Sequence, residues 1–94
     1  MKVLLDECVV QAFRHFIPGH DVFTVGYMGW LAVKNGQLLA QAVSEGFDAF
    51  VTTDRGVPYE QHVATLPIAV IILTAGTNDL SSLTPLAPQL LVSL

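Results

Sequence analysis

Short apolar runs along the chain predict four β-strands. Each run is four to six residues long and is either continuously apolar or rich in β-branched residues, which is typical of strands buried in a sheet. The run at 68–73 (IAVIIL) has no polar residue, as expected of a central parallel strand that is covered on both faces. The predicted strands cover residues 2–5, 22–25, 48–53 and 68–73.

Between and after these runs, apolar residues recur at helical spacing or follow helix-start signals. The predicted helices cover residues 9–16, 37–45, 58–65 and 79–94. Asn35 is the predicted N-cap of the second helix, and Gly46 occupies the position of a left-handed C-terminal cap. Pro58 suits the first turn of the third helix, whereas Pro85 and Pro88 are expected to break or kink the last.

Strands therefore alternate with helices through the whole chain. This order predicts parallel pairing, right-handed crossovers and helices on both faces of the sheet. The expected fold class is α/β, a three-layer α/β/α sandwich with a mostly parallel sheet of about four strands. In such a fold, ligands bind outside the carboxyl ends of the strands, near the point where the strand order reverses.

Composition sets further bounds. The 94 residues suffice for one domain, over 1–94, and 52% of them are apolar. Only 13% are charged, against a typical ~25%, so we expect leftover apolar surface that contacts a partner protein or a second copy. The alternative is a small, tightly packed domain of low solubility. The net charge of −4 argues against a basic surface that binds nucleic acid non-specifically.

The sequence also carries little sign of export or membrane insertion. Cys8 is the single cysteine and has no partner for an internal disulfide. No stretch approaches the ~18 apolar residues of a membrane span, and Met1 and Lys2 lead straight into a strand instead of a signal peptide. A cytoplasmic location is expected.

Three acidic residues follow two of the predicted strands. Asp6 and Glu7 follow the first strand and Asp54 follows the third, so all three should meet at one rim of the sheet. Carboxylates so close together repel one another unless a cation lies between them, and oxygen ligands suit Mg²⁺ or Mn²⁺. Such an ion could activate water for phosphodiester hydrolysis.

Structural roles for the same residues are open alternatives. Asp6 could cap the first helix, and Glu7 could lie in the first turn of that helix, where negative charge is favoured. Asp54 could form an Asx-turn. Arg55 could bind a substrate phosphate or pair with an acid. Aromatic residues of the glycine-rich loop could stack on a base, although covering the core is more usual; they are Tyr27 and Trp30.

Several short motifs, in this order and spacing, resemble small bacterial PIN-like proteins of unknown function, which are related to VapC-type toxins and Mut7-C domains. The likeness runs along most of the chain, and its motifs are residues 3–8 (VLLDEC), 19–22 (GHDV), 28–29 (MG), 51–54 (VTTD) and 66–70 (LPIAV). The resemblance implies a PIN-like fold, metal-dependent cleavage of RNA by Asp6, Glu7 and Asp54, and membership of a toxin–antitoxin pair.

The chain departs from this pattern at two places. Many relatives carry acidic residues at the start of the second helix, where this chain has Asn35, Gly36 and Gln37, and a second Asp near Gly56 or Val57. Because these acidic residues are missing, the alternative that the chain is a non-catalytic interaction module with the same fold stays open. A receiver-like phosphoacceptor is a further alternative, disfavoured because the chain's lysines are Lys2 and Lys34 and none follows a fifth strand.

Overall fold

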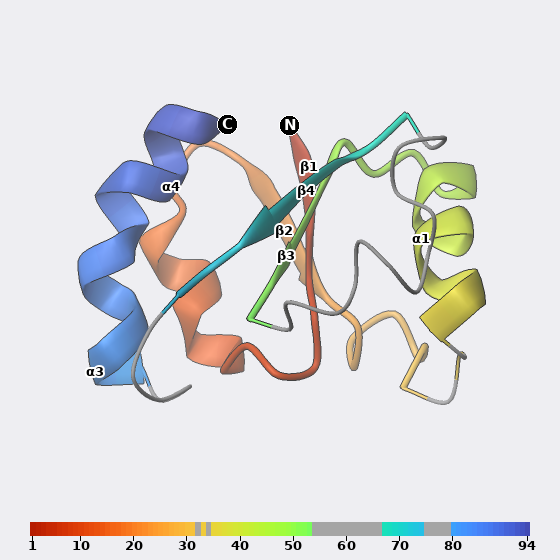
Figure 1. Cartoon of the computed structure of the whole chain (residues 1–94), viewed down its shortest axis with the longest axis horizontal. Helices are drawn as coiled ribbons and strands as arrows, with labels where there is room; N and C mark the ends of the chain where they lie inside the picture. Colours follow the sequence, from red (N-terminus) through yellow and green to blue (C-terminus); the bar gives the residue numbers. More distant parts are fainter. Residues whose placement is uncertain (32, 34, 54–66, 75–79) are drawn as a thin grey trace.

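A parallel β-sheet forms the centre of the molecule. The computed structural model describes residues 1–31, 33, 35–53, 67–74 and 80–94. Within them, four strands pair in the order β2-β1-β3-β4, all parallel (Figure 1). The strands are β1 (Lys2–Leu5), β2 (Asp21–Thr24), β3 (Ala49–Thr52) and β4 (Ala69–Ile72). The prediction of an α/β protein with a parallel sheet of about four strands is confirmed.

The strand order reverses between the two central strands. From β1 the chain crosses to β2 on one side, and the later strands β3 and β4 continue on the other side. Leu5, the last residue of β1, is in register with Thr24 of β2 and with Val51 of β3. The carboxyl ends of β1 and β3 therefore lie side by side at the topological switch point, where α/β sheets bind ligands.

Helices lie on both faces of this sheet (Figure 1). The helix α1 (Asn35–Ser44) packs on one face, and the opposite face carries four segments. These segments are the 3₁₀ helix η1 (Gln11–Phe16), α3 (Leu80–Leu83), the 3₁₀ turn η3 (Thr84–Leu86) and α4 (Ala87–Ser93). The predicted interruption of the last helix is confirmed, because η3 contains Pro85, and Pro88 lies in the first turn of α4.

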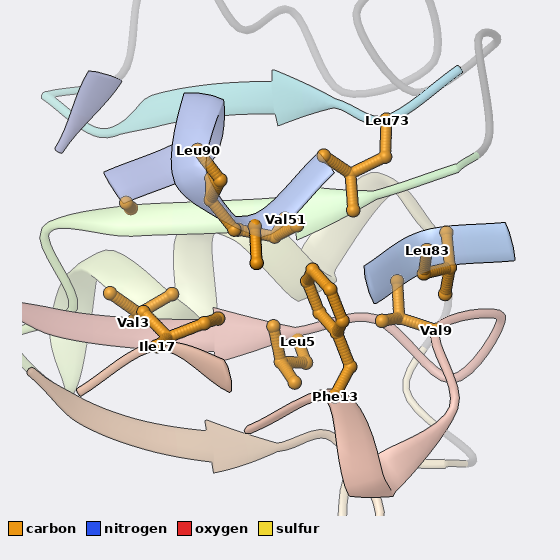
Figure 2. Close-up of a cluster of buried hydrophobic side chains, with 11 residues drawn as sticks. Val3, Leu5, Val9, Phe13, Ile17, Val51, Leu73, Leu83 and Leu90 are labelled. Atoms are coloured by element: carbon orange, nitrogen blue, oxygen red, sulfur yellow. The ribbon is translucent and has the colours of Figure 1, made fainter. Parts of the chain in front are cut away.

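The two faces have separate apolar cores because side chains alternate along each strand. Val3 and Leu5 of β1 belong to one core, whose side chains converge between the sheet and η1, α3 and α4 (Figure 2). Leu4 points to the other core, which lies under α1 and includes Phe50 of β3. All four of these side chains are fully buried. The central strands are therefore anchored on both faces, which fixes the position of their carboxyl ends.

The first helix differs from the prediction. An α-helix was expected over 9–16, but η1 is a 3₁₀ helix that begins at Gln11. The residues between β1 and η1 form a turn in which Val9 N–H donates to Asp6 O at 3.0 Å, and Val10 has an extended backbone (φ −60°, ψ 133°). Helical geometry cannot start before this turn is complete.

The second predicted helix is confirmed, with a shifted start. It begins at Asn35, so this residue lies within the first turn of α1 and is not its N-cap. At the other end, Gly46 has φ +83°, and its N–H donates to Val43 O while Phe47 N–H donates to Ala42 O, both at 3.0 Å. This pair of bonds is a Schellman motif, as the glycine predicted.

The last strand, β4, corrects a second expectation. The IAVIIL run predicted a central strand, but β4 is the outer strand of the described sheet. Ala69 is exposed, and Val70, Ile71 and Ile72 are only half-buried. The run is still apolar on both sides because Val70 packs against the core under α1 and Ile71 against the opposite core.

The remaining expectations concern apolar surface and the third helix. Large apolar side chains exposed in the described residues are scattered over separate segments: Met1, Phe16, Tyr27, Leu31 and Val92. Of the helices in the same part of the chain, none has the length and apolar character that crossing a membrane requires. The helix predicted over 58–65 lies outside the described residues.

Candidate functional site

Asp6 directly follows β1 at the switch point. Its backbone N–H donates to Val51 O of β3 at 2.9 Å, which continues the ladder between the two central strands by one residue. The side chain is half-buried at the carboxyl edge of the sheet. The predicted placement of Asp6 at this rim is confirmed.

The two shortest hydrogen bonds that the described residues give to the Asp6 carboxylate come from Thr52 and Glu7. Thr52 Oγ1 donates to Oδ2 at 2.7 Å, and the Glu7 backbone N–H donates to Oδ1 at 2.8 Å. Thr52 is fully buried and ends β3, so its hydroxyl bridges the carboxyl ends of β1 and β3. A carboxylate has about four lone-pair positions; among the described residues these two bonds and a longer one from the Cys8 thiol occupy three of them, which leaves about one for a further ligand.

Cys8 is a neighbour of this carboxylate that the sequence did not assign to the site. Its Sγ donates a hydrogen bond to Asp6 Oδ2 at 3.5 Å and lies 3.4 Å from Thr52 Oγ1, and it accepts a hydrogen bond from the Thr53 N–H at 3.5 Å. The thiol is half-buried and lies in the turn before η1, not at a helix N-terminus. The only sequence signal for this contact is the position of Cys8 two residues after Asp6.

The alternative capping roles for Asp6 and Glu7, which follow β1, are wrong. η1 begins at Gln11, five residues after Asp6, and its N-cap position is occupied by Val10 without a side-chain cap bond. Glu7 is exposed in the intervening turn, outside any helical first turn. Capping therefore does not explain either acid.

The other predicted site residues, Asp54 and Arg55, lie outside the described residues. The last described residue before them is Thr53, which directly follows β3 and contacts Cys8 through its backbone. In the part of the chain that the structure describes, no three His, Cys, Asp or Glu side chains group so as to hold a metal ion. The proposed pairing of Asp6 with Asp54 stays a prediction.

The aromatic residues of the glycine-rich loop differ in their surroundings. Trp30 packs edge-to-face on Phe47 with ring centroids 5.9 Å apart, next to the core under α1, so it covers the core as the commoner interpretation predicted. The Tyr27 side chain is 76% exposed. Its ring is tilted against Phe23 at a centroid distance of 5.7 Å.

The site offers a half-buried carboxylate that accepts hydrogen bonds from the Thr52 hydroxyl, the Glu7 backbone N–H and the Cys8 thiol. Among the described residues, no Lys, Arg or His pairs with Asp6, so its negative charge is not neutralised by a neighbour there. A hard divalent cation would suit these oxygens. Comparison with family models, with curated proteins and with solved structures gave no match to this chain.

Proposed function

We propose that this protein is a metal-dependent ribonuclease of PIN-like type that acts in the cytoplasm as the toxin component of a toxin–antitoxin pair. The helices on both faces of the parallel sheet support the PIN-like three-layer sandwich that this proposal needs. The observation that carries the proposal is the fixed Asp6 carboxylate at the switch point. The antitoxin and a second copy of the chain are the proposed protein partners.

Asp6 and Asp54 would hold Mg²⁺ or Mn²⁺, which supplies positive charge for the phosphate and lowers the pKa of a bound water. The Thr52 hydroxyl and the Glu7 backbone N–H hold the Asp6 carboxylate in place at the carboxyl ends of β1 and β3. This geometry supports a role for Asp6 as a direct metal ligand.

The remaining residues would act on water and substrate. Glu7 is exposed one residue after Asp6, which suits a side chain that orients and deprotonates the attacking water. Oxygen of that water forms a new bond to phosphorus, the P–O bond to the leaving sugar breaks, and the leaving oxygen takes up a proton. Arg55 follows Asp54 in the sequence and would bind the substrate phosphate.

An RNA cleavage assay tests this function. Wild-type protein should cut single-stranded RNA with Mn²⁺ and should stop when EDTA is added, and Asp6→Asn should lose at least about 100-fold in rate because metal binding is lost. Asp21→Asn is a matched control, since Asp21 is an exposed aspartate that begins β2 and so lies at the amino ends of the strands, opposite the candidate site. An Asp6→Asn protein as active as Asp21→Asn would exclude the proposed mechanism.

The second candidate is a catalytically degenerate PIN-like interaction module. Among the described residues, Asp6 is the one carboxylate whose oxygens hydrogen-bond at the switch point, so a complete acidic set there depends on Asp54. Exposed apolar side chains such as Leu31 and Val92 would suit contact with a protein partner. A module of this kind should bind its partner with the same affinity after Asp6→Asn, whereas a nuclease should lose metal binding.

A further inference from the structure

An open pocket of about 410 Å³ lies on the β2 side of the sheet, next to the candidate site. Its connection to Asp6 runs through the strand register. Thr24 of the pocket pairs with Leu5, Val25 N–H donates to Leu5 O at 3.0 Å, and Asp6 is the next residue after Leu5. The pocket is lined by Gln11, Arg14, Val22, Phe23, Thr24, Gly26 and Tyr27.

Arg14 gives this pocket a positive charge in an acidic protein. It is exposed in the last turn of η1, and no carboxylate of the described residues forms an ion pair with it. The chain has four Lys and Arg residues against eight Asp and Glu. Lys2, at the opposite edge of the sheet, is already engaged: its Nζ donates to Glu45 O at 2.7 Å and lies 4.5 Å from the Phe47 ring centroid.

Tyr27 gives the pocket an aromatic face. Its backbone N–H donates to Thr24 Oγ1 at 3.0 Å, and Met28 N–H donates to Thr24 O at 3.1 Å, so the loop that carries the ring is tied to the end of β2. One side of the ring meets Phe23, yet 76% of the side chain remains exposed. A tyrosine so exposed adds little to the core and keeps a ring surface for a ligand.

Gln11 and Gly26 also line the pocket. Gln11 Nε2 lies 3.6 Å from the position that a Cβ would take on Gly26, so the amide sits close over the glycine backbone. An amide donor, a guanidinium and an exposed aromatic ring are thus collected within one open pocket. This is the combination by which proteins bind single-stranded nucleic acid, with bases stacked on aromatic rings and phosphates on cations.

We propose that this pocket binds one nucleotide of a single-stranded RNA, with its base on Tyr27 and its phosphate on Arg14. The inference deepens the proposed nuclease function. It rests on that function only for the path of the RNA beyond the pocket, in which the bound RNA continues past Thr24 to Asp6. Stacking accepts every base, so the pocket binds RNA without sequence preference. One cation in a chain of net charge −4 makes the binding weak and sensitive to salt.

The test is binding of a fluorescein-labelled oligouridine of about ten nucleotides, followed by fluorescence anisotropy in EDTA so that no metal and no cleavage are involved. Tyr27→Ala should weaken binding at least about fivefold, and Tyr27→Phe should restore it, because one stacked base is worth a factor of that size. Arg14→Gln should also weaken binding and should lower the slope of log K against log salt by about 0.7, the value for one phosphate contact on a single strand. Tyr27→Ala should leave that slope unchanged.

Val92→Glu is the matched control for charge. It changes the net charge by the same −1 as Arg14→Gln, at an 88% exposed position on α4 that does not line the pocket. It should bind within about twofold of wild type. If wild-type protein binds no oligouridine, or if Val92→Glu weakens binding as much as Arg14→Gln, the inference is overturned.

The two proposals can fail separately. Metal-free binding that depends on Tyr27 and Arg14, in a protein that neither binds Mn²⁺ nor cuts RNA, would support the pocket and overturn the nuclease. Metal-dependent cleavage with no effect of Tyr27→Ala or Arg14→Gln on KM would support the nuclease and overturn the pocket.

Discussion

The hydroxyl of Thr52 donates a 2.7 Å hydrogen bond to Oδ2 of Asp6, across the carboxyl ends of the two central strands. The two residues are 46 positions apart in the sequence, and the parallel pairing of β1 with β3 brings them together. Thr52 is fully buried, so its hydroxyl cannot turn to solvent for another partner. The bond therefore links the two strands and restricts the orientation of the candidate catalytic carboxylate.

Loss of this bond should lower stability. Thr52→Val keeps the shape of the side chain but removes the donor to a charged acceptor, which should reduce the free energy of unfolding by about 1.5–3 kcal/mol in urea titrations. Thr53→Val is the matched control, because Thr53 contacts Cys8 through its backbone N–H and that donor remains. Equal stability of the two variants would show that the Thr52–Asp6 bond contributes nothing.

Gly46 should be required by its backbone conformation. A Cβ at this position would meet no atom within 4 Å, but the φ of +83° is strained for residues with a side chain. Gly46→Ala should cost about 1–2 kcal/mol, which lowers Tm by about 4–8 °C per kcal/mol in a domain of this size. Gly46→Asn should cost less, since Asn adopts this conformation more readily, so an Asn variant that is less stable than the Ala variant would contradict the account.

The two phenylalanines of η1 should differ strongly in their contribution to stability. Phe13 is fully buried among the side chains of Figure 2, whereas Phe16 is 38% exposed and stacks on it with ring centroids 6.5 Å apart. Phe13→Ala should cost about 3–5 kcal/mol, and Phe16→Ala about 1 kcal/mol or less. The comparison uses chemical denaturation, and similar losses for both would mean that η1 packs differently from the structure.

The strands were the most predictable part of this fold. The short apolar runs leave little freedom in where a strand can begin and end. Each predicted strand therefore matches the observed one to within one residue at either end. The first helix was less predictable because the Asp6–Val9 turn depends on backbone hydrogen bonds and delays helix formation, although the apolar spacing continues through it.

The position of β4 and the neighbours of Asp6 depend on tertiary arrangement. An apolar run indicates that a strand contacts both layers but not whether another strand lies beside it, so the run predicts a central strand where β4 is the outer one. In the same way, sequence placed Asp6 at the rim from its position after a strand. The contacts with Cys8 and Thr52 follow from the register between β1 and β3, which no local pattern encodes.

The half-buried outer strand should support self-association. Within the described sheet β4 pairs only with β3, and an apolar strand edge is a site for pairing with a second copy. Ile72→Lys should shift sedimentation-velocity profiles toward monomer, whereas Val92→Lys, on the exposed surface of α4, should not. A wild-type protein that stays monomeric at high concentration would contradict a homo-oligomer built on this edge.

The most direct test of the central claim is calorimetric titration of Mn²⁺ into wild-type protein, Asp6→Asn, Asp54→Asn and the Asp21→Asn control. The account predicts one binding site in the wild type that is retained in Asp21→Asn, weakened at least about tenfold in Asp6→Asn and in Asp54→Asn, and lost when both acids are replaced. Binding that persists in the double variant, or no binding by the wild type at millimolar metal, would contradict a metal centre at the carboxyl ends of β1 and β3.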